Sequence, residues 1–220
     1  QTICLNSDPA ALEETTPATS VGTISYQWQS NTTGCSGSFA NIIGATSLSY
    51  DPSPLLQTTY YRRAVTSSIN STDCTAYSNC ITVTVNNVTP GTISGNQTVC
   101  SGGDPSAFTQ TAASGSGSIT YQWQSSVTDC TTGFTDIPGA SGSTYDPPAG
   151  LTLTTYYRRH AISSLNGFSC SIPSNCITVF VNNVNSGSIA GDQTICQNGD
   201  PALLTSAQAG SGDGSVTYRW

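Results

Sequence analysis

The sequence contains no lysine and no methionine, and it carries few charges of either sign. Charged residues make up 8% of the 220 positions and the net charge is −7, whereas about 25% is typical of soluble domains. The basic residues are all arginines: Arg62, Arg63, Arg158, Arg159 and Arg219. Phosphate backbones and anionic lipid surfaces are bound by fields of positive charge. The composition therefore argues against a nucleic-acid partner and against binding to a membrane surface.

Long apolar runs are also missing. No stretch approaches the ~20 consecutive apolar residues of a membrane span, and no charged-then-apolar leader opens the chain. We therefore expect no membrane insertion. If the protein is secreted, its signal has been removed or lies outside this sequence.

Cysteine, in contrast, is abundant, with nine residues in a chain that is poor in charge. This combination suits an oxidising compartment outside the cell, where cysteines form disulfides. Zinc is the alternative, but five residues separate the cysteines in CTAYSNC and CSIPSNC, and no CxxC occurs. The only histidine, His160, is not close to a cysteine in the sequence. We therefore expect disulfides and no metal.

The cysteines belong to an internal repeat of 96 residues. This spacing separates Cys4, Cys100 and Cys196, and it also separates Cys74 from Cys170 and Cys80 from Cys176. TTYYRR occurs twice in the same phase, and ISYQWQS returns as ITYQWQS and then VTYRW, which aligns Trp220 with Trp28 and Trp123. We assign residues 1–87 to repeat 1, whose first strand is partly missing, residues 88–184 to repeat 2, and residues 185–220 to the first part of a third repeat.

Alternating apolar and polar residues predict an all-β fold. Ile24, Tyr26 and Trp28 share one face of a strand, and turn-forming residues interrupt each repeat at short intervals. Each repeat therefore reads as an immunoglobulin-like β-sandwich, and the chain as tandem sandwiches stapled by disulfides, like beads on a string. TTYYRR should place one tyrosine of each pair at a corner, either Tyr60 or Tyr61 in repeat 1, and either Tyr156 or Tyr157 in repeat 2. At least one arginine of each pair should keep its head group in water.

Four cysteines per repeat allow three pairings. Cys74 and Cys80 are too far apart to bond if the chain between them is extended. The pairs that we favour are Cys4–Cys74, Cys35–Cys80, Cys100–Cys170 and Cys130–Cys176, with the partner of Cys196 outside this sequence. Crosslinks between adjacent repeats remain an open alternative.

Several segments together resemble a known group of repeats: QTVCSGGDPSAF, ITYQWQSS, FTDIPGASGSTYDPPAGLTLTTYYRR and SNCITVFVNNVNSGSIAGDQTIC. They are similar to the tandem immunoglobulin-like repeats of very large Bacteroidota cell-surface adhesins, such as the SprB-type adhesins of gliding motility. This resemblance implies a filament on the cell surface, exported by the type IX route, that contacts substrates or other cells. The sequence contains no recognisable secretion domain, binding tip or anchor.

Residues with catalytic or metal-binding potential do not form a recognisable set. His160 has Ala64 at the matching position of repeat 1, and the adjacent Glu13 and Glu14 should face opposite sides of a strand, which disfavours glycoside hydrolysis. Five aspartates precede prolines, which is typical of turns, with calcium at a joint as the alternative: Asp8, Asp51, Asp104, Asp146 and Asp200. We expect neither an enzyme nor a cofactor.

The sequence thus predicts a non-enzymatic structural or adhesive segment of an extracellular surface filament. Its partners would be other repeats of the same chain, neighbouring filament chains or surface polysaccharide. A repeated weak carbohydrate or cell-contact site is the main alternative, although Tyr50 and Tyr145 lie just before Asp-Pro turns and Trp28 and Trp123 should be in the core. A subunit completed by strand addition from a neighbouring chain is a lesser alternative.

Overall fold

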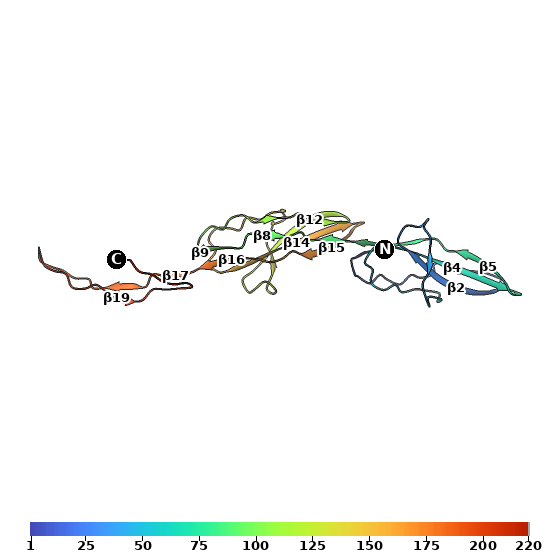
Figure 1. The fold of residues 1–220 in the computed structure, drawn as a ribbon, viewed down its shortest axis with the longest axis horizontal. Coiled ribbons are helices and arrows are strands. Elements are labelled where there is room, and N and C mark those ends of the chain that lie inside the picture. The colour runs from blue at the N-terminus through green and yellow to red at the C-terminus, as the bar shows by residue number, and fades with distance from the viewer. Residues whose placement is uncertain (220) are drawn as a thin grey trace. The chain divides into compact units, whose positions relative to one another are not determined.

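The fold is built from strands and turns (Figure 1). A computed structural model describes residues 1–219, so Trp220 and its alignment with the other two tryptophans lie outside the described residues. These residues contain no helix, and hence none that could cross a membrane. The chain forms two compact units. The first comprises Gln1–Pro90, Ala113–Thr120 and Ala161–Ile172, and the second comprises Gly91–Ala112, Tyr121–His160 and Pro173–Trp220.

The strands follow the repeat. Those of repeat 1 are β1 (Thr2–Cys4), β2 (Thr23–Asn31), β3 (Ala40–Asn41), β4 (Thr59–Ile69), β5 (Thr72–Tyr77) and β6 (Ile81–Asn86). Those of repeat 2 are β7 (Val88–Thr89), β8 (Ile93–Ser94), β9 (Gln97–Cys100), β10 (Thr109–Gln110), β11 (Ser114–Gly115), β12 (Ser118–Ser126), β13 (Thr135–Asp136), β14 (Thr155–Leu165), β15 (Phe168–Pro173) and β16 (Ile177–Asn182). β17 (Val184–Asn185) spans the boundary to the third repeat, which contributes β18 (Ser188–Ala190), β19 (Thr205–Gln208) and β20 (Ser211–Gly212).

Repeat 1 has one six-stranded sheet in the order β1-β6-β4-β2-β3, with β5 also beside β4. The long strand β4 pairs with β2 along one edge, and on its other edge with β6 near its start and β5 near its end. β1 runs parallel to β6, so the first and last strands of the repeat are neighbours. The opposite layer is sparse and is held by bridges such as Leu12 with Tyr50.

Repeat 2 reproduces this sheet in the order β13-β12-β14-β16-β9, with β15 beside β14. Even the register is kept, since Thr155 faces Val179 as Thr59 faces Val83. The opposite layer is again small, with β8 paired to β10 and the Phe108 amide donating to the Tyr145 carbonyl over 2.9 Å. The predicted fold class is confirmed: both repeats are all-β, immunoglobulin-like sandwiches.

A tryptophan lies at the centre of each core, as its strand parity predicts. Trp28 and Trp123 are 2% and 0% exposed, and their indole N–H groups donate to the carbonyls of Ser47 and Gly142. The residues packed around them are Ile3, Leu12, Tyr61, Val83 and Val85 in repeat 1, and Ile93, Phe108, Tyr157, Ile177 and Val179 in repeat 2. The inward tyrosine of each TTYYRR segment is therefore the second one.

The disulfides differ in part from the expected set. Cys35 is bonded to Cys80 and Cys130 to Cys176, within their repeats. Cys4, however, is bonded to Cys170 of the next repeat. The expected Cys4–Cys74 and Cys100–Cys170 bonds are absent from the described residues, where Cys74, Cys100 and Cys196 are free and exposed.

The positions of the two cysteines in the sheet explain why Cys4 does not bond to Cys74. Cys4 pairs with Asn86 at the end of β6, whereas Cys74 pairs with Ser67 on β4. β6 meets β4 only at Thr59–Tyr61, so Cys4 and Cys74 lie at opposite ends of one sheet, about 20 Å or more apart at ~3.3 Å per residue. A disulfide needs Cα atoms within ~7 Å.

Candidate functional site

The most distinctive feature of the first compact unit is a joint between two repeats, which we define by Cys4, Asn86, Ser163, Phe168 and Cys170. The disulfide joins the end of β1 to β15, with Cα atoms 5.6 Å apart and 166 residues between the two cysteines. Cys170 is 2% exposed. Two of the three bonds in the described residues follow the repeat, and this one crosses it.

Besides the disulfide, the side chain of Asn86 holds the joint together through hydrogen bonds. Its side chain is 0% exposed and donates to the carbonyl oxygens of Ser163 at 2.7 Å and Phe168 at 3.1 Å. The Ser163 hydroxyl donates back to the Asn86 side-chain carbonyl at 2.7 Å. A buried amide is stable only when its donors and acceptor find partners, so Asn86 fixes where the β14–β15 hairpin docks.

The linker between repeats is also tied down within this unit. β7 pairs with β11, the Ser116 amide donates to the Asn87 carbonyl, and the Asn87 amide donates to the Ser116 hydroxyl. A Cβ at Gly115 would lie 2.8 Å from the Asn87 carbonyl oxygen and 2.9 Å from the Ser163 hydroxyl. A larger side chain there would push the linker away from the joint.

A second feature, which the sequence analysis missed, is a buried arginine in each repeat. Arg63 is 6% exposed and Arg159 is 0% exposed. We expected only that at least one arginine of each pair keeps its head group in water, and this expectation did not say that the other one is buried. Strand alternation carries the signal, because Arg63 follows Tyr61 and Arg159 follows Tyr157 on the same face. Burying a guanidinium requires charge and hydrogen-bond partners.

The two buried arginines use different partners. Arg63 forms an ion pair with Glu14, donates to the Leu48 carbonyl at 2.7 Å and lies 4.4 Å from the Tyr26 ring. Arg159 donates to the Gln110 side chain and to the Thr111 and Ser143 carbonyls, and it lies 4.4 Å from the Tyr121 ring. Burial lowers the pKa of Arg159, with the Tyr121 hydroxyl opposing this shift. Gln110 occupies the position that Glu14 occupies in repeat 1.

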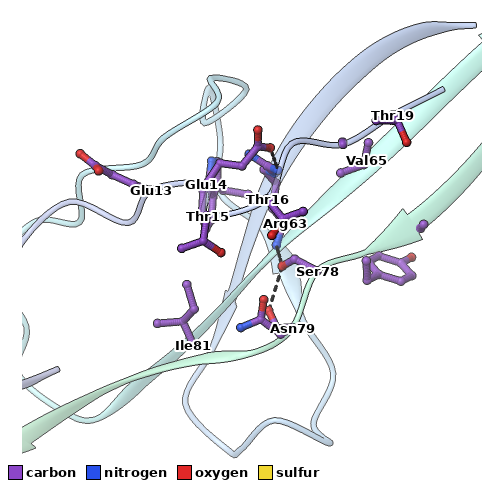
Figure 2. A pocket seen from close by; sticks show the side chains of 14 residues that line it. Glu13, Glu14, Thr15, Thr16, Thr19, Arg63, Val65, Ser78, Asn79 and Ile81 are labelled. Carbon is purple, nitrogen blue, oxygen red and sulfur yellow. Dashed lines mark hydrogen bonds and ion pairs between the residues drawn. The ribbon is translucent and has the colours of Figure 1, made fainter.

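A groove of about 590 Å³ opens beside Arg63 (Figure 2). The residues that line it include Glu14, Thr16, Ser78, Asn79 and the buried Trp28. Glu13 is exposed and points away from Glu14, whose carboxylate is taken up by Arg63. The structure therefore does not bring the two glutamates together as a carboxylate pair.

The outer face of β4 and β14 carries the first arginine of each TTYYRR segment. Arg62 lies 4.3 Å from the Phe39 ring and 4.0 Å from the Tyr77 ring, and its Nε donates to the Gln29 side chain at 2.7 Å. Arg158 repeats the contact to the glutamine and lies 4.1 Å from Phe134, but Pro173 stands where repeat 1 has Tyr77. Tyr77 is 56% exposed, so its ring is available to a ligand in repeat 1 alone.

His160 lies on the outer face of β14, beside Arg158. Burial lowers the pKa of His160, and the positive charge of Arg158 lowers it further, against a smaller opposing effect of Asp136. Its Nε2 is buried without a hydrogen-bond partner among the described residues. This histidine is a packed residue that resists protonation.

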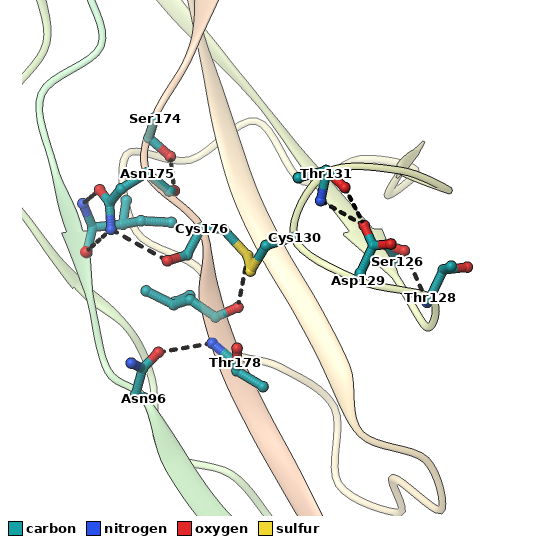
Figure 3. Close-up of a disulfide and its surroundings, with 12 residues drawn as sticks. Asn96, Ser126, Thr128, Asp129, Cys130, Thr131, Ser174, Asn175, Cys176 and Thr178 are labelled. Carbon is teal, nitrogen blue, oxygen red and sulfur yellow. Dashed lines mark hydrogen bonds between the residues drawn. A yellow bond between two sulfur atoms is a disulfide. The ribbon is translucent and has the colours of Figure 1, made fainter.

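The Cys130–Cys176 disulfide of the second unit sits in a network of polar turns (Figure 3). The Asn96 side chain accepts from the Thr178 amide, and Asn175 exchanges hydrogen bonds with the Ile93 backbone. Next to the disulfide, the Asp129 carboxylate accepts from the amides and hydroxyls of Thr131 and Thr132, which lowers its pKa to about 2. These contacts position the loop that carries Cys130.

The aspartates before prolines are exposed, whereas Pro9, Pro52, Pro105 and Pro147 behind them are buried. This arrangement fits turn chemistry, in which the proline anchors the chain. Within the described residues, no group of three or more histidine, cysteine or acidic side chains is arranged to hold a metal. Tyr50 and Tyr145 are half-buried and pack against the core rings, with Tyr50 5.9 Å from Trp28 and Tyr145 5.5 Å from Trp123.

Comparison with known families decides the relationship of the chain. A sequence profile described as a domain of unknown function (DUF8696) matches residues 1–87 and again residues 89–183. The chain belongs to this family. No curated protein matches it. Among solved structures it is similar to the crystal structure of Dscam1 isoform 6.9, N-terminal four Ig domains, with 15% sequence identity and a TM-score of 0.35. That alignment covers 82% of this chain and 43% of the other.

Proposed function

We propose that this pair of DUF8696 repeats is a structural and adhesive segment of a long extracellular filament. The observation that carries the proposal is the joint, in which a disulfide and a buried asparagine fasten one repeat to the next. Such fastening suits a chain whose task is to hold repeats together outside the cell, where disulfides persist. The finer assignment is a surface adhesin of Bacteroidota gliding motility, exported by the type IX route, and it rests on the sequence resemblance.

The third repeat supports a tandem array. Ile189 is 69% exposed and Leu204 is 46% exposed, whereas the matching Ile93 and Phe108 are 2% exposed in repeat 2. Exposed apolar positions of this kind are covered when a sandwich has both layers. In the proposed filament, further strands of the same polypeptide cover them, rather than strands added from a neighbouring chain.

The experiment is to label intact source cells with antibodies raised against the purified chain and to view them by immunogold electron microscopy. We expect gold along filaments outside the envelope, and Fab fragments of the same antibodies should reduce attachment of the cells to glass. Fab fragments from pre-immune serum are the control. Label confined to the cell interior would overturn the filament proposal, and surface label without an effect on attachment would leave a structural rather than adhesive role.

A weak carbohydrate site is the second candidate, and the exposed Tyr77 ring beside Arg62 favours it. Aromatic rings of this kind can stack on sugars. Because repeat 2 has Pro173 at that position, the site would be confined to repeat 1 rather than copied along the filament. Glycan-array binding that is lost in Tyr77→Ala and kept in Tyr60→Ala would support this candidate.

A further inference from the structure

The three free cysteines of the described chain occupy positions at which another copy is bonded. Cys100 and Cys196 correspond to Cys4, and Cys74 corresponds to Cys170, each by the 96-residue period. Cys4 and Cys170 form the disulfide of the joint. Each of the three free cysteines is thus equivalent to one of the two cysteines that form the disulfide of the joint.

Repeat 2 carries a complete receiving half of a joint, formed by Cys100 and Asn182. Cys100 pairs with Asn182 in parallel strands as Cys4 pairs with Asn86 in repeat 1. Asn86 is buried by the hairpin of the next repeat, whereas Asn182 is exposed and Cys100 is a free thiol. The two side chains that hold the hairpin in the first joint are therefore present, adjacent and uncovered in the second.

Repeat 1 carries the matching hairpin half, formed by Ser67 and Cys74. Ser67 faces Cys74 across β4 and β5, and the two correspond to Ser163 and Cys170. The hairpin turns also match, because Asn70 and Ser71 have φ values of 48° and 64°, and Asn166 and Gly167 have values of 52° and 76°. A hairpin with the conformation that docks in the joint is thus displayed with its cysteine exposed.

The linker after repeat 2 gives an independent indication. The Asn183 amide donates to the Asp213 carboxylate at 2.8 Å, and the Asp213 amide donates back to the Asn183 carbonyl at 3.1 Å. This reproduces the exchange between Asn87 and Ser116 in the first linker. β17 pairs with β20 as β7 pairs with β11. The third repeat therefore leaves repeat 2 along the path by which repeat 2 leaves repeat 1.

We propose that Cys100 and Asn182 bind the hairpin of the following repeat. Cys100 then forms a disulfide with the cysteine of that repeat that is equivalent to Cys170. The Cys74 hairpin fills the same role toward a preceding repeat. This proposal rests on the proposed function, in which the polypeptide continues as tandem repeats. Each closure removes two thiol protons and two electrons, forms one S–S bond and reduces one disulfide oxidant, such as oxidised glutathione, to two thiols.

The test adds one complete repeat to the existing chain. A second copy of residues 88–183 is inserted after Asn183, so that the junction keeps the native Asn–Val step. The inserted copy carries Cys100→Ser, which leaves its Cys170 no partner within its own repeat. Both chains are refolded with a glutathione redox couple, denatured, labelled with iodoacetamide and weighed intact, so that the number of labels counts the free thiols.

Cys100→Ser should change the number of free thiols in opposite directions in the two chains. In the original chain, Cys100→Ser lowers the count from the three free thiols to two. In the extended chain the expected count is two, for Cys74 and Cys196, and Cys100→Ser at the original position raises it to three by releasing the inserted Cys170. Near-UV circular dichroism checks that each variant folds, and if the serine variant fails to fold, the count in the extended chain decides by itself.

Four labels in the extended chain would overturn the proposal, because Cys100 and the inserted Cys170 would both be free. Covalent dimers of the extended chain on a non-reducing gel that vanish both in Cys100→Ser and in Cys74→Ser would also overturn it, since they would show that Cys100 bonds the hairpin of a second molecule rather than that of the following repeat. Neither outcome depends on adhesion or cell labelling. Failure of this inference is therefore distinguishable from failure of the proposed function.

Discussion

Repeats 1 and 2 have nearly the same sheet but neutralise their buried arginine in different ways. Arg63 is paired with a carboxylate, Glu14, whereas Arg159 is held by the Gln110 amide and backbone carbonyls. Both guanidinium groups also lie over a tyrosine ring. The comparison shows that the ring and the carbonyls are common to both arginine sites, and that Gln110 of repeat 2 stands at the position of Glu14 in repeat 1.

The cores differ in a second way. Repeat 1 has Leu12 where repeat 2 has Phe108, and Phe108 adds a ring 5.8 Å from Trp123 and 5.1 Å from Tyr157. Similar registers thus place an aliphatic side chain in one core and an additional aromatic ring at the same position in the other. Each core has adjusted to its own residue, so exchange between them should be costly.

The largest expected effect comes from removing the acidic partner in repeat 1. Glu14→Ala leaves the buried Arg63 without its counter-charge and should destabilise repeat 1 by about 3 kcal/mol. Gln110→Ala removes a neutral partner and should cost repeat 2 about 1 kcal/mol. Hydrogen exchange measured by mass spectrometry in increasing urea reports the two repeats separately.

The control for this prediction is Glu13→Ala, because Glu13 is exposed and carries the same charge. It should change stability by less than about 0.5 kcal/mol. Equal losses for Glu14→Ala and Gln110→Ala would contradict the distinction between a charged and a neutral side chain at this position.

Core exchange should give an intermediate effect. Leu12→Phe overfills repeat 1 and should cost about 2 kcal/mol, while Phe108→Leu loses ring contacts in repeat 2 and should cost about 1 kcal/mol. Urea unfolding of each variant provides the measurement. If either exchange stabilised its repeat, the two cores would not be individually adjusted, and the comparison would reduce to chance substitution.

The smallest expected effect concerns pH. Because burial and Arg158 lower the pKa of His160 in the folded repeat, the unfolded chain binds the proton more readily. The stability contributed by neutral His160 is present above the unfolded pKa of about 6.5 and is lost as the pH falls below it. Repeat 2 should therefore weaken from pH 7.5 to 5.5 in unfolding experiments.

Repeat 1 has Ala64 at this position and gives the matched comparison. His160→Ala should remove the pH dependence of repeat 2 over this range and leave that of repeat 1 unchanged. A pH dependence that persists in His160→Ala would assign it to other groups.

The alternation of apolar and polar residues along the strands predicted much of the fold. Alternation in ISYQWQS placed Trp28 and Trp123 in the cores, and the repeat phase placed equivalent strands in both sandwiches. Parity alone left the choice between Tyr60 and Tyr61 open, because both faces of that segment carry an aromatic and an arginine. Once Tyr61 is known to be buried, Arg63 on the same face follows.

The Cys4–Cys170 pairing could not be predicted from the spacing of cysteines within a repeat. Pairing within a repeat minimises the loop that must close, which favours Cys4 with Cys74 over a cysteine 166 residues away. What overrides this preference is the position of β1 at one end of the sheet and of the β4–β5 hairpin at the other. That information resides in strand pairing across the sheet and not in cysteine spacing.

The Cys4–Cys170 bond also determines which part of the chain bears tension. A pull applied to the two ends of the described chain passes from residue 4 across the sulfur atoms to residue 170, so the 166 intervening steps of backbone carry no load. At ~3.3 Å per residue, about 550 Å of contour length is withheld from stretching while the bond is intact. Repeat 1 and most of repeat 2 therefore carry no tension, and the chain can yield only outside the segment between Cys4 and Cys170.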